Sequence, residues 1–269
     1  MNGGNGKRNS LWGARSARSQ AWAVRVATFG LFAGIWEIST YRLESLLIPT
    51  FSQTMKGLFQ ITLVTRELWE PLMVSNQALV IGYLLSVMIG IPLGLSMARM
   101  RRIEQIADAY IKVMLAVPVS PLIPIIMMAL GLGLTARVSV VILFALIFIT
   151  VNTRAGVRNV EPELIEMAKS FGATEGQIWR RILIPGAMPA IMAGLRIGLG
   201  RAVTGMVIVE LLLVASGIGH LLLEFRGLFQ KDLLFALVFV VIIEAVILMG
   251  AMRAVERRLI PWANTAASS

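Results

Sequence analysis

Long segments without a charged residue constrain this chain more than any other feature of its sequence. Residues 72–98 carry no charge, and neither do residues 113–136. About 20 apolar residues in a helix cross the hydrocarbon core of a bilayer, whereas barrel strands alternate apolar and polar residues over about ten positions. Because a helix satisfies its own backbone hydrogen bonds in lipid, we predict an all-α integral membrane protein.

About six transmembrane helices are expected. Besides the two uncharged segments, the apolar regions are 21–41, 138–153, 185–214 and 233–252. Only 15% of the 269 residues are charged, against roughly 25% in soluble chains. The pattern predicts four parts: a cytoplasmic N-terminal tail (1–20), a first transmembrane helix with an outer loop (21–70), a transmembrane domain (71–256) and a cytoplasmic C-terminal tail (257–269).

The net charge of +10 could suggest a nucleic-acid partner, but the basic residues lie between the apolar segments. This placement indicates an orientation in a membrane and no nucleic-acid partner. With the N-terminus placed inside, sixteen of the 25 Lys and Arg residues fall in inner segments and six in outer ones. Basic residues concentrate in the cytoplasmic loops of membrane proteins. We therefore expect both termini to be cytoplasmic, in a multi-pass protein of the lipid bilayer.

The residues needed for catalysis or for binding a metal are scarce. The chain has no cysteine and one histidine, His220, and it lacks the G-x-x-x-x-G-K-[S/T] loop that binds nucleotide phosphates. We expect no metal, no cofactor and no catalytic residue on this chain. A membrane-embedded enzyme is disfavoured for the same reason.

One cytoplasmic segment, between the fourth and fifth predicted spans, carries a specific pattern. Glu166-Met167-Ala168 is followed after three residues by Gly172, and after nine more by Ile182-Leu183-Ile184-Pro185. We predict a helix over 161–170 that Gly172 ends, a second helix over 175–181 that Thr174 caps, and a span that Pro185 starts. Ala168 and Gly172, four residues apart, are expected to leave a small face for close packing. The segment should form a helical hairpin in the cytoplasm.

This spacing resembles the EAA loop of the permease subunits of ABC importers, E-A-A-x3-G-x9-I-x-L-P, from which Met167 and Ile184 depart. Other segments are similar to the nitrate, sulfonate and taurine branch of these permeases. They include Val117-Pro118, Leu122-Ile123-Pro124, Asn152-Thr153, Gly194-Leu195-Arg196, Val209-Glu210 and Ser216-Gly217-Ile218-Gly219. The resemblance covers about 72–258, and the first seventy residues resemble the branch only loosely.

The resemblance implies a type-1 ABC importer permease fold and a place in a bacterial plasma (inner) membrane. Two copies would form the translocation path, two ABC ATPase subunits would hold ATP and Mg on the cytoplasmic side, and an extracytoplasmic binding protein would deliver a small anion such as a sulfonate, taurine or nitrate. The coupling loop, 161–185, would contact the ATPase through Glu166, Ala168, Gly172, Ala173, Thr174, Glu175, Gln177, Ile178, Arg180 and Pro185. The alternative is a secondary transporter or channel driven by an ion gradient.

Several residues within the predicted spans are candidates for the translocation path: Pro118, Pro121, Pro124, Arg196, Arg201 and Glu210. The three prolines predict a kinked or discontinuous third span, which serves either as a gate or as a packing feature. Arg196 and Glu210 share a helix face but lie about 21 Å apart along the axis, too far to pair. An arginine in the path suits an anionic substrate, and a structural role for each arginine stays open.

Two further patterns predict packing. Gly194 and Gly198 form a small-x-x-x-small face, which indicates close helix contact, with a dimer interface as one option. Glu104, Asp108 and Lys112 follow an i, i+4, i+8 ladder and are expected to pair along one helix.

Overall fold

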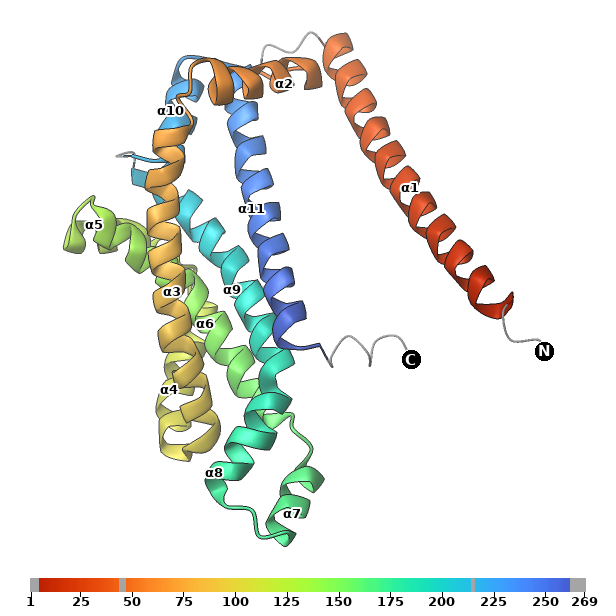
Figure 1. The fold of residues 1–269 in the computed structure, drawn as a ribbon. Helices are drawn as coiled ribbons and strands as arrows, with labels where there is room; N and C mark the ends of the chain where they lie inside the picture. The colour runs from red at the N-terminus through yellow and green to blue at the C-terminus, as the bar shows by residue number, and fades with distance from the viewer. Residues whose placement is uncertain (1–4, 44–46, 214–215, 262–269) are drawn as a thin grey trace.

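The computed structural model describes residues 5–43, 47–213 and 216–261, and every regular element in these ranges is helical. Figure 1 shows the arrangement. In chain order, the elements are α1 (Asn5–Leu43), α2 (Phe51–Phe59), the π-helical turn η1 (Gln60–Val64), α3 (Trp69–Arg99), α4 (Arg101–Ala116), α5 (Leu122–Leu130), α6 (Leu134–Arg158), α7 (Pro162–Ser170), α8 (Glu175–Ile178), the π-helical turn η2 (Trp179–Leu183), α9 (Ile184–Leu213), α10 (Ile218–Gly227) and α11 (Lys231–Leu259).

Four helices in the described residues are long and apolar enough to cross a membrane. They are α3, α6, the continuous helix Glu175–Leu212 and α11. α1 contains the predicted first span. The predicted third span is not one helix, because α4 ends at Ala116, α5 covers only Leu122–Leu130, and Gly131 ends α5 with a φ of 79°.

The break between α4 and α5 follows from the prolines of this region. Val117 takes an extended conformation at the end of α4, as expected for the residue before Pro118. Pro121 is the capping residue immediately before α5, where no helical hydrogen bond requires its missing N–H. The prediction of a discontinuous helix here is confirmed.

The centre of the bundle is α6, which lies between α3 and α9 (Figure 1). Glycines on both neighbours allow a close approach. A Cβ atom on Gly94 of α3 would stand 2.7 Å from the carbonyl oxygen of Thr150, and one on Gly198 of α9 would stand 2.7 Å from Ile149. Backbones that approach this closely gain van der Waals contact, which holds helices together in lipid.

The glycine face of α9 therefore packs inside the subunit. A Cβ atom on Gly194 would stand 2.6 Å from Asn152 Cβ on α6, so this position is filled by the chain's own helix, as is that of Gly198. The prediction of close helix packing is confirmed. The option of a dimer contact through Gly194 and Gly198 is wrong, because α6 already occupies this face.

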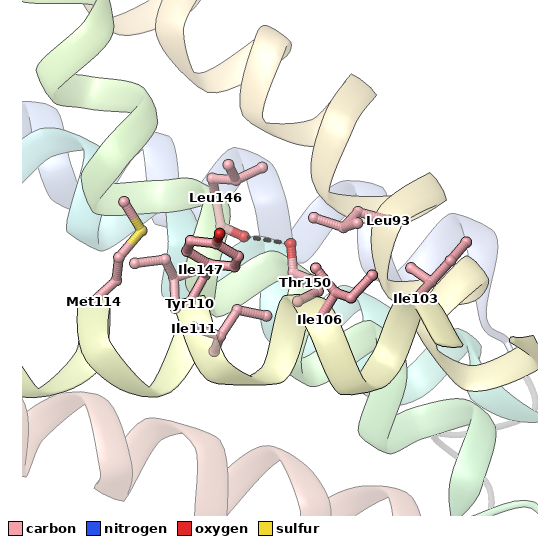
Figure 2. A pocket seen from close by; sticks show the side chains of 10 residues that line it. Leu93, Ile103, Ile106, Tyr110, Ile111, Met114, Leu146, Ile147 and Thr150 are labelled. Carbon is pink, nitrogen blue, oxygen red and sulfur yellow. Dashed lines mark hydrogen bonds between the residues drawn. The ribbon is translucent and has the colours of Figure 1, made fainter. Parts of the chain in front are cut away.

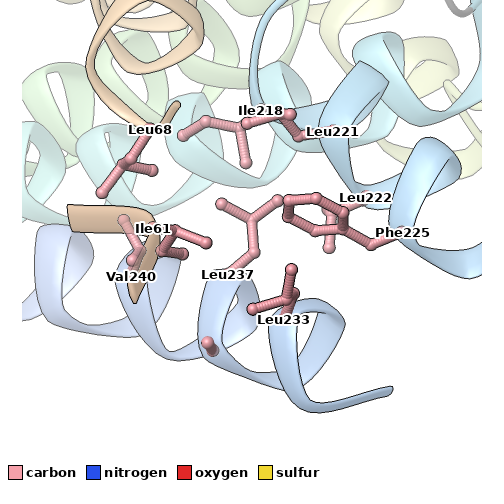
Figure 3. Packing of buried hydrophobic residues seen from close by; sticks show 10 residues of the cluster. Ile61, Leu68, Ile218, Leu221, Leu222, Phe225, Leu233, Leu237 and Val240 are labelled. Atoms are coloured by element: carbon pink, nitrogen blue, oxygen red, sulfur yellow. The ribbon is translucent and has the colours of Figure 1, made fainter. Parts of the chain in front are cut away.

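One end of the bundle holds an apolar cluster built from α2, η1, α10 and α11. Figure 3 shows Ile61, Phe225 and Leu237 pointing toward one another, and all three are buried. α1 joins this end through Trp36, whose ring stacks on Phe239 at a centroid distance of 5.7 Å. From there α1 slants away from the bundle (Figure 1). The cluster fixes the amphipathic helices α2 and α10 at the end opposite α7 and α8.

Candidate functional site

Residues 161–185 contain the predicted helical hairpin. α7 ends in a Schellman motif: the N–H of Gly172 donates to the carbonyl of Lys169 at 2.9 Å, and the N–H of Ala173 donates to that of Ala168 at 3.0 Å. Gly172 has a φ of 77°, which L-residues with a side chain rarely adopt. The glycine is therefore required by backbone geometry, and the predicted helix end is confirmed.

The second helix of the hairpin begins with a complete capping box. Thr174 Oγ1 accepts a hydrogen bond from the N–H of Gln177 at 3.4 Å, and Gln177 Oε1 accepts one from the N–H of Thr174 at 2.8 Å. Such a box satisfies two backbone donors that the first turn of a helix leaves free. The direction of α8 is thus set by residues within the hairpin, as predicted.

Apolar contacts hold the hairpin against the ends of α6 and α9. Ile178 is 3% exposed and packs in a cluster with Val157, Val160 and Leu183. Arg99, at the end of α3, lies over the ring of Trp179 at 5.6 Å from its centroid. The hairpin is consequently attached to α3, α6 and α9 together, so a force on α8 reaches three spanning helices.

Ala168 and Gly172 do not form the expected shared packing face. Ala168 packs toward the cluster beneath the hairpin, whereas a Cβ atom on Gly172 would have nothing within 4 Å. This prediction is wrong because Gly172 is placed at the exposed tip by its positive φ, where no helix opposes it.

Pro185 lies within a continuous helix instead of starting a separate span. Residues 175–213 run through α8, η2 and α9 without a break. The N–H of Ile184 donates to the carbonyl of Trp179, five residues back. Because a proline N–H is missing and its ring crowds the preceding turn, a π-helical turn before Pro185 lets the helix continue.

The outward face of the hairpin is open and mixed in character. Phe171 is 85% exposed at its tip. Beside it lies a hollow of about 600 Å³ lined by Thr174, Gly176, Gln177, Arg180 and Arg181. Of the predicted coupling residues, Glu166, Gly172, Thr174, Glu175, Gln177 and Arg180 are exposed, Ala168, Ala173 and Pro185 are half-buried, and Ile178 is buried. A protein partner can bind a surface that combines an exposed aromatic side chain with a basic hollow.

The two arginines of α9 have different surroundings. Arg196 Nη1 forms an ion pair with Glu256 Oε2 of α11 at 2.9 Å. The guanidinium of Arg201 lies over the ring of Phe148 at 4.7 Å from its centroid, and the side chain is exposed. Both arginines line a hollow of about 350 Å³ with Thr204 and other residues of α9 and α11. Arg196 thus has a carboxylate partner, whereas the partner of Arg201 among the described residues is an aromatic ring.

Glu210 does not face an open path in this subunit. It is 3% exposed, and its Oε2 accepts hydrogen bonds from Ser75 Oγ at 2.7 Å and from the N–H of Gly219 at 3.1 Å. Arg137 lies 3.7 Å from its Oε1. The prediction of a path residue is corrected, because Glu210 joins α3, α6, α9 and α10 inside the subunit. Sequence reasoning missed Ser75 and Arg137, since no local pattern links them to Glu210.

The prolines of the predicted third span lie at an exposed corner. Pro118, Pro121 and Pro124 are all exposed; the first two lie in the segment that joins α4 to α5, and Pro124 lies in the first turn of α5. Toward the other end of α4, a hollow of about 430 Å³ separates that helix from α3 and α6. Figure 2 shows its apolar lining, in which Tyr110 and Ile111 of α4 lie close to Ile147 of α6.

Ion pairs fasten the polar end of α4 to α6. Arg154 binds both Asp108, at 2.6 Å, and Glu104, and Arg158 Nη2 lies 2.6 Å from Glu104. Lys112 pairs with Asp108 at 2.7 Å, as the ladder predicts. Glu104, in contrast, pairs across helices instead of along its own. Sequence reasoning did not consider Arg154 and Arg158 of α6 as partners of Glu104.

The described residues thus form four apolar helices long enough to span a membrane, one of which continues from a polar helical hairpin. The chain belongs to the family described as the binding-protein-dependent transport system inner membrane component, which it matches over residues 90–261. It is accordingly an inner membrane transport component of the ABC permease type.

Relatives and solved structures agree with this assignment. The chain is 30% identical to the taurine transport system permease protein TauC of Escherichia coli (strain K12), with 84% of each chain covered. It is 31% identical to the putative aliphatic sulfonates transport permease protein SsuC of the same organism, covering 89% of this chain and 90% of SsuC. In fold it is similar to a chain of the inward-facing MetNI methionine ABC transporter, with a TM-score of 0.59 at 20% identity, covering 74% of this chain and 97% of that one.

Proposed function

We propose that this chain forms the translocation path of an importer and couples it to ATP hydrolysis on a separate ATPase subunit. The observation that carries the proposal is the α7–α8 hairpin, which has Phe171 exposed at its tip and a basic hollow beside it. Its inner side packs against α6 and α9. Movement of a partner bound to the hairpin would therefore reach the spanning helices. ATP and Mg would be held by that partner, and no cofactor by this chain.

The assembly that we propose contains two copies of this chain, two ATPase subunits below them and a binding protein on the opposite face. α1 supports the second copy, because it slants away from the bundle (Figure 1) with Phe29, Phe32 and Ile35 exposed. The hairpin end would be cytoplasmic, in agreement with the excess of Lys and Arg in the predicted inner segments. Both termini would lie on that side. Light scattering of the purified assembly should give a mass with two copies of each membrane and ATPase subunit.

The substrate that we propose is a small organic or inorganic anion, such as a sulfonate, taurine or nitrate. Arg201 supports this choice, since it is exposed in a hollow of α9 and has no carboxylate partner within 4 Å among the described residues. A guanidinium binds planar or tetrahedral oxyanions through paired hydrogen bonds. The names of two relatives, which mention taurine and aliphatic sulfonates, point to the same chemistry.

The coupling proposal is tested by replacing the exposed ring of the hairpin. Phe171→Ser removes this ring without touching the cluster around Ile178, so the protein should reach the membrane in normal amount. We expect co-purification with the ATPase subunit and uptake of labelled taurine to fall about tenfold or more, as is common when a central aromatic residue of an interface is lost.

The control is Phe229→Ser, which alters another exposed phenylalanine, 82% accessible, at the outer end of the bundle. It should retain ATPase binding in detergent. If uptake survives loss of the ATPase and follows an imposed ion gradient, the coupling proposal is wrong. The protein would then be a secondary transporter or channel.

A further inference from the structure

A second cavity, separate from the hairpin and from Arg201, lies between four elements. Its volume is about 440 Å³, and it is lined by residues of α2, η1, α3 and α11 and by Leu68, which precedes α3. Two lining residues, Leu68 and Val240, also belong to the apolar cluster of Figure 3. The lining is mostly apolar and includes the ring of Trp69. A space of this size holds a small organic molecule, and far exceeds what a single ion needs.

Three polar side-chain atoms in this cavity lack hydrogen-bond partners. Both carboxylate oxygens of Glu244 and the hydroxyl of Thr62 are buried without a hydrogen bond. Asn76 lies close to Glu244, but its amide nitrogen donates to the carbonyl of Leu72 at 3.0 Å. Among the described residues, the other buried side-chain atoms without a hydrogen bond are on Arg137 and Glu210, which face each other. Most of the buried side-chain atoms without a hydrogen bond among the described residues therefore lie in this cavity.

The two carboxylate oxygens of Glu244 only accept hydrogen bonds, so they call for a donor, and the Thr62 hydroxyl can accept one as well. Glu244 lies midway along α11, where a carboxylate is far from both membrane surfaces. A proton would remove its charge and let one oxygen donate, but the other oxygen would still lack a donor. A divalent metal ion needs several oxygen ligands, and the described residues contain no group of three His, Cys, Asp or Glu side chains. An organic ammonium supplies a positive charge and up to three N–H donors at once.

We propose that this cavity binds a primary ammonium compound with an apolar tail. The ammonium group pairs with Glu244 and donates to Thr62, and the tail lies along the apolar walls beside Trp69. The ammonium comes either from the headgroup of a membrane lipid or from a free amphiphilic amine. The site is independent of the proposed substrate path, since Arg201 lines a different hollow.

The test measures binding of decylammonium to the full-length chain in phosphatidylcholine nanodiscs, a lipid whose headgroup nitrogen carries no N–H. The signal is tryptophan fluorescence, because Trp69 lines the cavity. The part of the fluorescence change that is absent in Trp69→Phe reports on this site. We expect a saturable change with decylammonium, and binding of decanol weaker by about tenfold or more, because the alcohol lacks the charge. Equal binding of decanol would overturn the proposal, and this comparison needs no variant.

The variant that tests the carboxylate is Glu244→Gln, which keeps the size of the side chain and removes its charge. It should weaken decylammonium binding by about tenfold or more, whereas Glu224→Gln, an exposed carboxylate on α10, should bind like the wild type. Unchanged binding by Glu244→Gln would contradict the proposal. Nanodiscs of phosphatidylethanolamine distinguish the two sources: competition by this lipid identifies the headgroup, and its absence identifies a free amine.

Discussion

Ser75 on α3 and Glu210 on α9 are joined by a buried hydrogen bond of 2.7 Å, although 135 residues separate them in the chain. Ser75 Oγ also accepts a hydrogen bond from the N–H of Ile218, at the start of α10, at 2.9 Å. One hydroxyl thus links two spanning helices to the outer amphipathic helix. Because Glu210 is buried, its carboxylate depends on the hydrogen bonds donated by Ser75 and by the N–H of Gly219.

Ser75→Ala is expected to destabilise the folded protein. Loss of the hydroxyl leaves a buried carboxylate short of a donor, which costs about 1–3 kcal/mol. The measurement is the thermal unfolding midpoint of the purified protein in detergent. Ser86→Ala is the matched control on the same helix, since Ser86 Oγ donates only to the carbonyl of Gly82 within α3. Equal shifts for the two variants would show that the link to Glu210 adds nothing.

Gly172→Ala should disturb the tip of the hairpin. Its φ of 77° lies in the left-handed region, where a side chain costs roughly 1–2 kcal/mol. We expect faster amide hydrogen exchange in residues 168–175 and weaker ATPase co-purification. Gly176→Ala is the control, because Gly176 has open space around it and no positive φ. Identical behaviour of both variants would mean that the Schellman motif is not required.

Gly198→Leu should separate α9 from α6. The close contact with Ile149 leaves no room for a side chain, and overpacking of a tight interface typically costs about 1–3 kcal/mol or more. The expected result is loss of the folded protein from detergent extracts, measured by size-exclusion chromatography. Gly250→Leu on α11, where a Cβ atom meets nothing within 4 Å, should elute normally. A well-folded Gly198→Leu would refute this packing.

Arg201→Ala should raise the KM for uptake of a sulfonate by about tenfold or more without changing the amount of protein in the membrane. The reason is the loss of a charge-assisted pair with the anion, worth about 1.5–3 kcal/mol. Arg201→Lys should be intermediate, because lysine keeps the charge but not the paired geometry. Unchanged KM in both variants would assign Arg201 to the contact with Phe148 alone.

Acidification should loosen α4 from α6. The Lys112 hydrogen bond, followed by that of Arg154, holds the pKa of Asp108 below its ordinary value of 3.8. A lowered pKa in the folded state means that the stabilisation is present at neutral pH and is lost as the pH falls below about 4 toward the folded-state pKa. Unfolding midpoints of wild type and Asp108→Asn between pH 7 and 3 check this. The two curves should converge at the acidic end, and a constant gap would contradict the prediction.

Local patterns predicted the parts of this protein that depend on nearby residues. The apolar segments identified α3, α6, α9 and α11, since hydrogen bonds within a helix and transfer into lipid are local effects. The caps of the hairpin followed from Gly172 and Thr174 for the same reason, and the break between α4 and α5 followed from the prolines.

Contacts between distant segments were decided by the tertiary structure alone. Glu210 shares a helix with Arg201, but only the packing of α3 and α10 against α9 shows that Glu210 is buried. Likewise, only the approach of α6 shows that Gly194 packs inside the subunit. The sequence by itself determined which segments enter the membrane, because that choice rests on the composition of each segment. The tertiary structure determined which polar groups within the membrane meet, because those meetings depend on the relative rotation of helices and no local pattern records it.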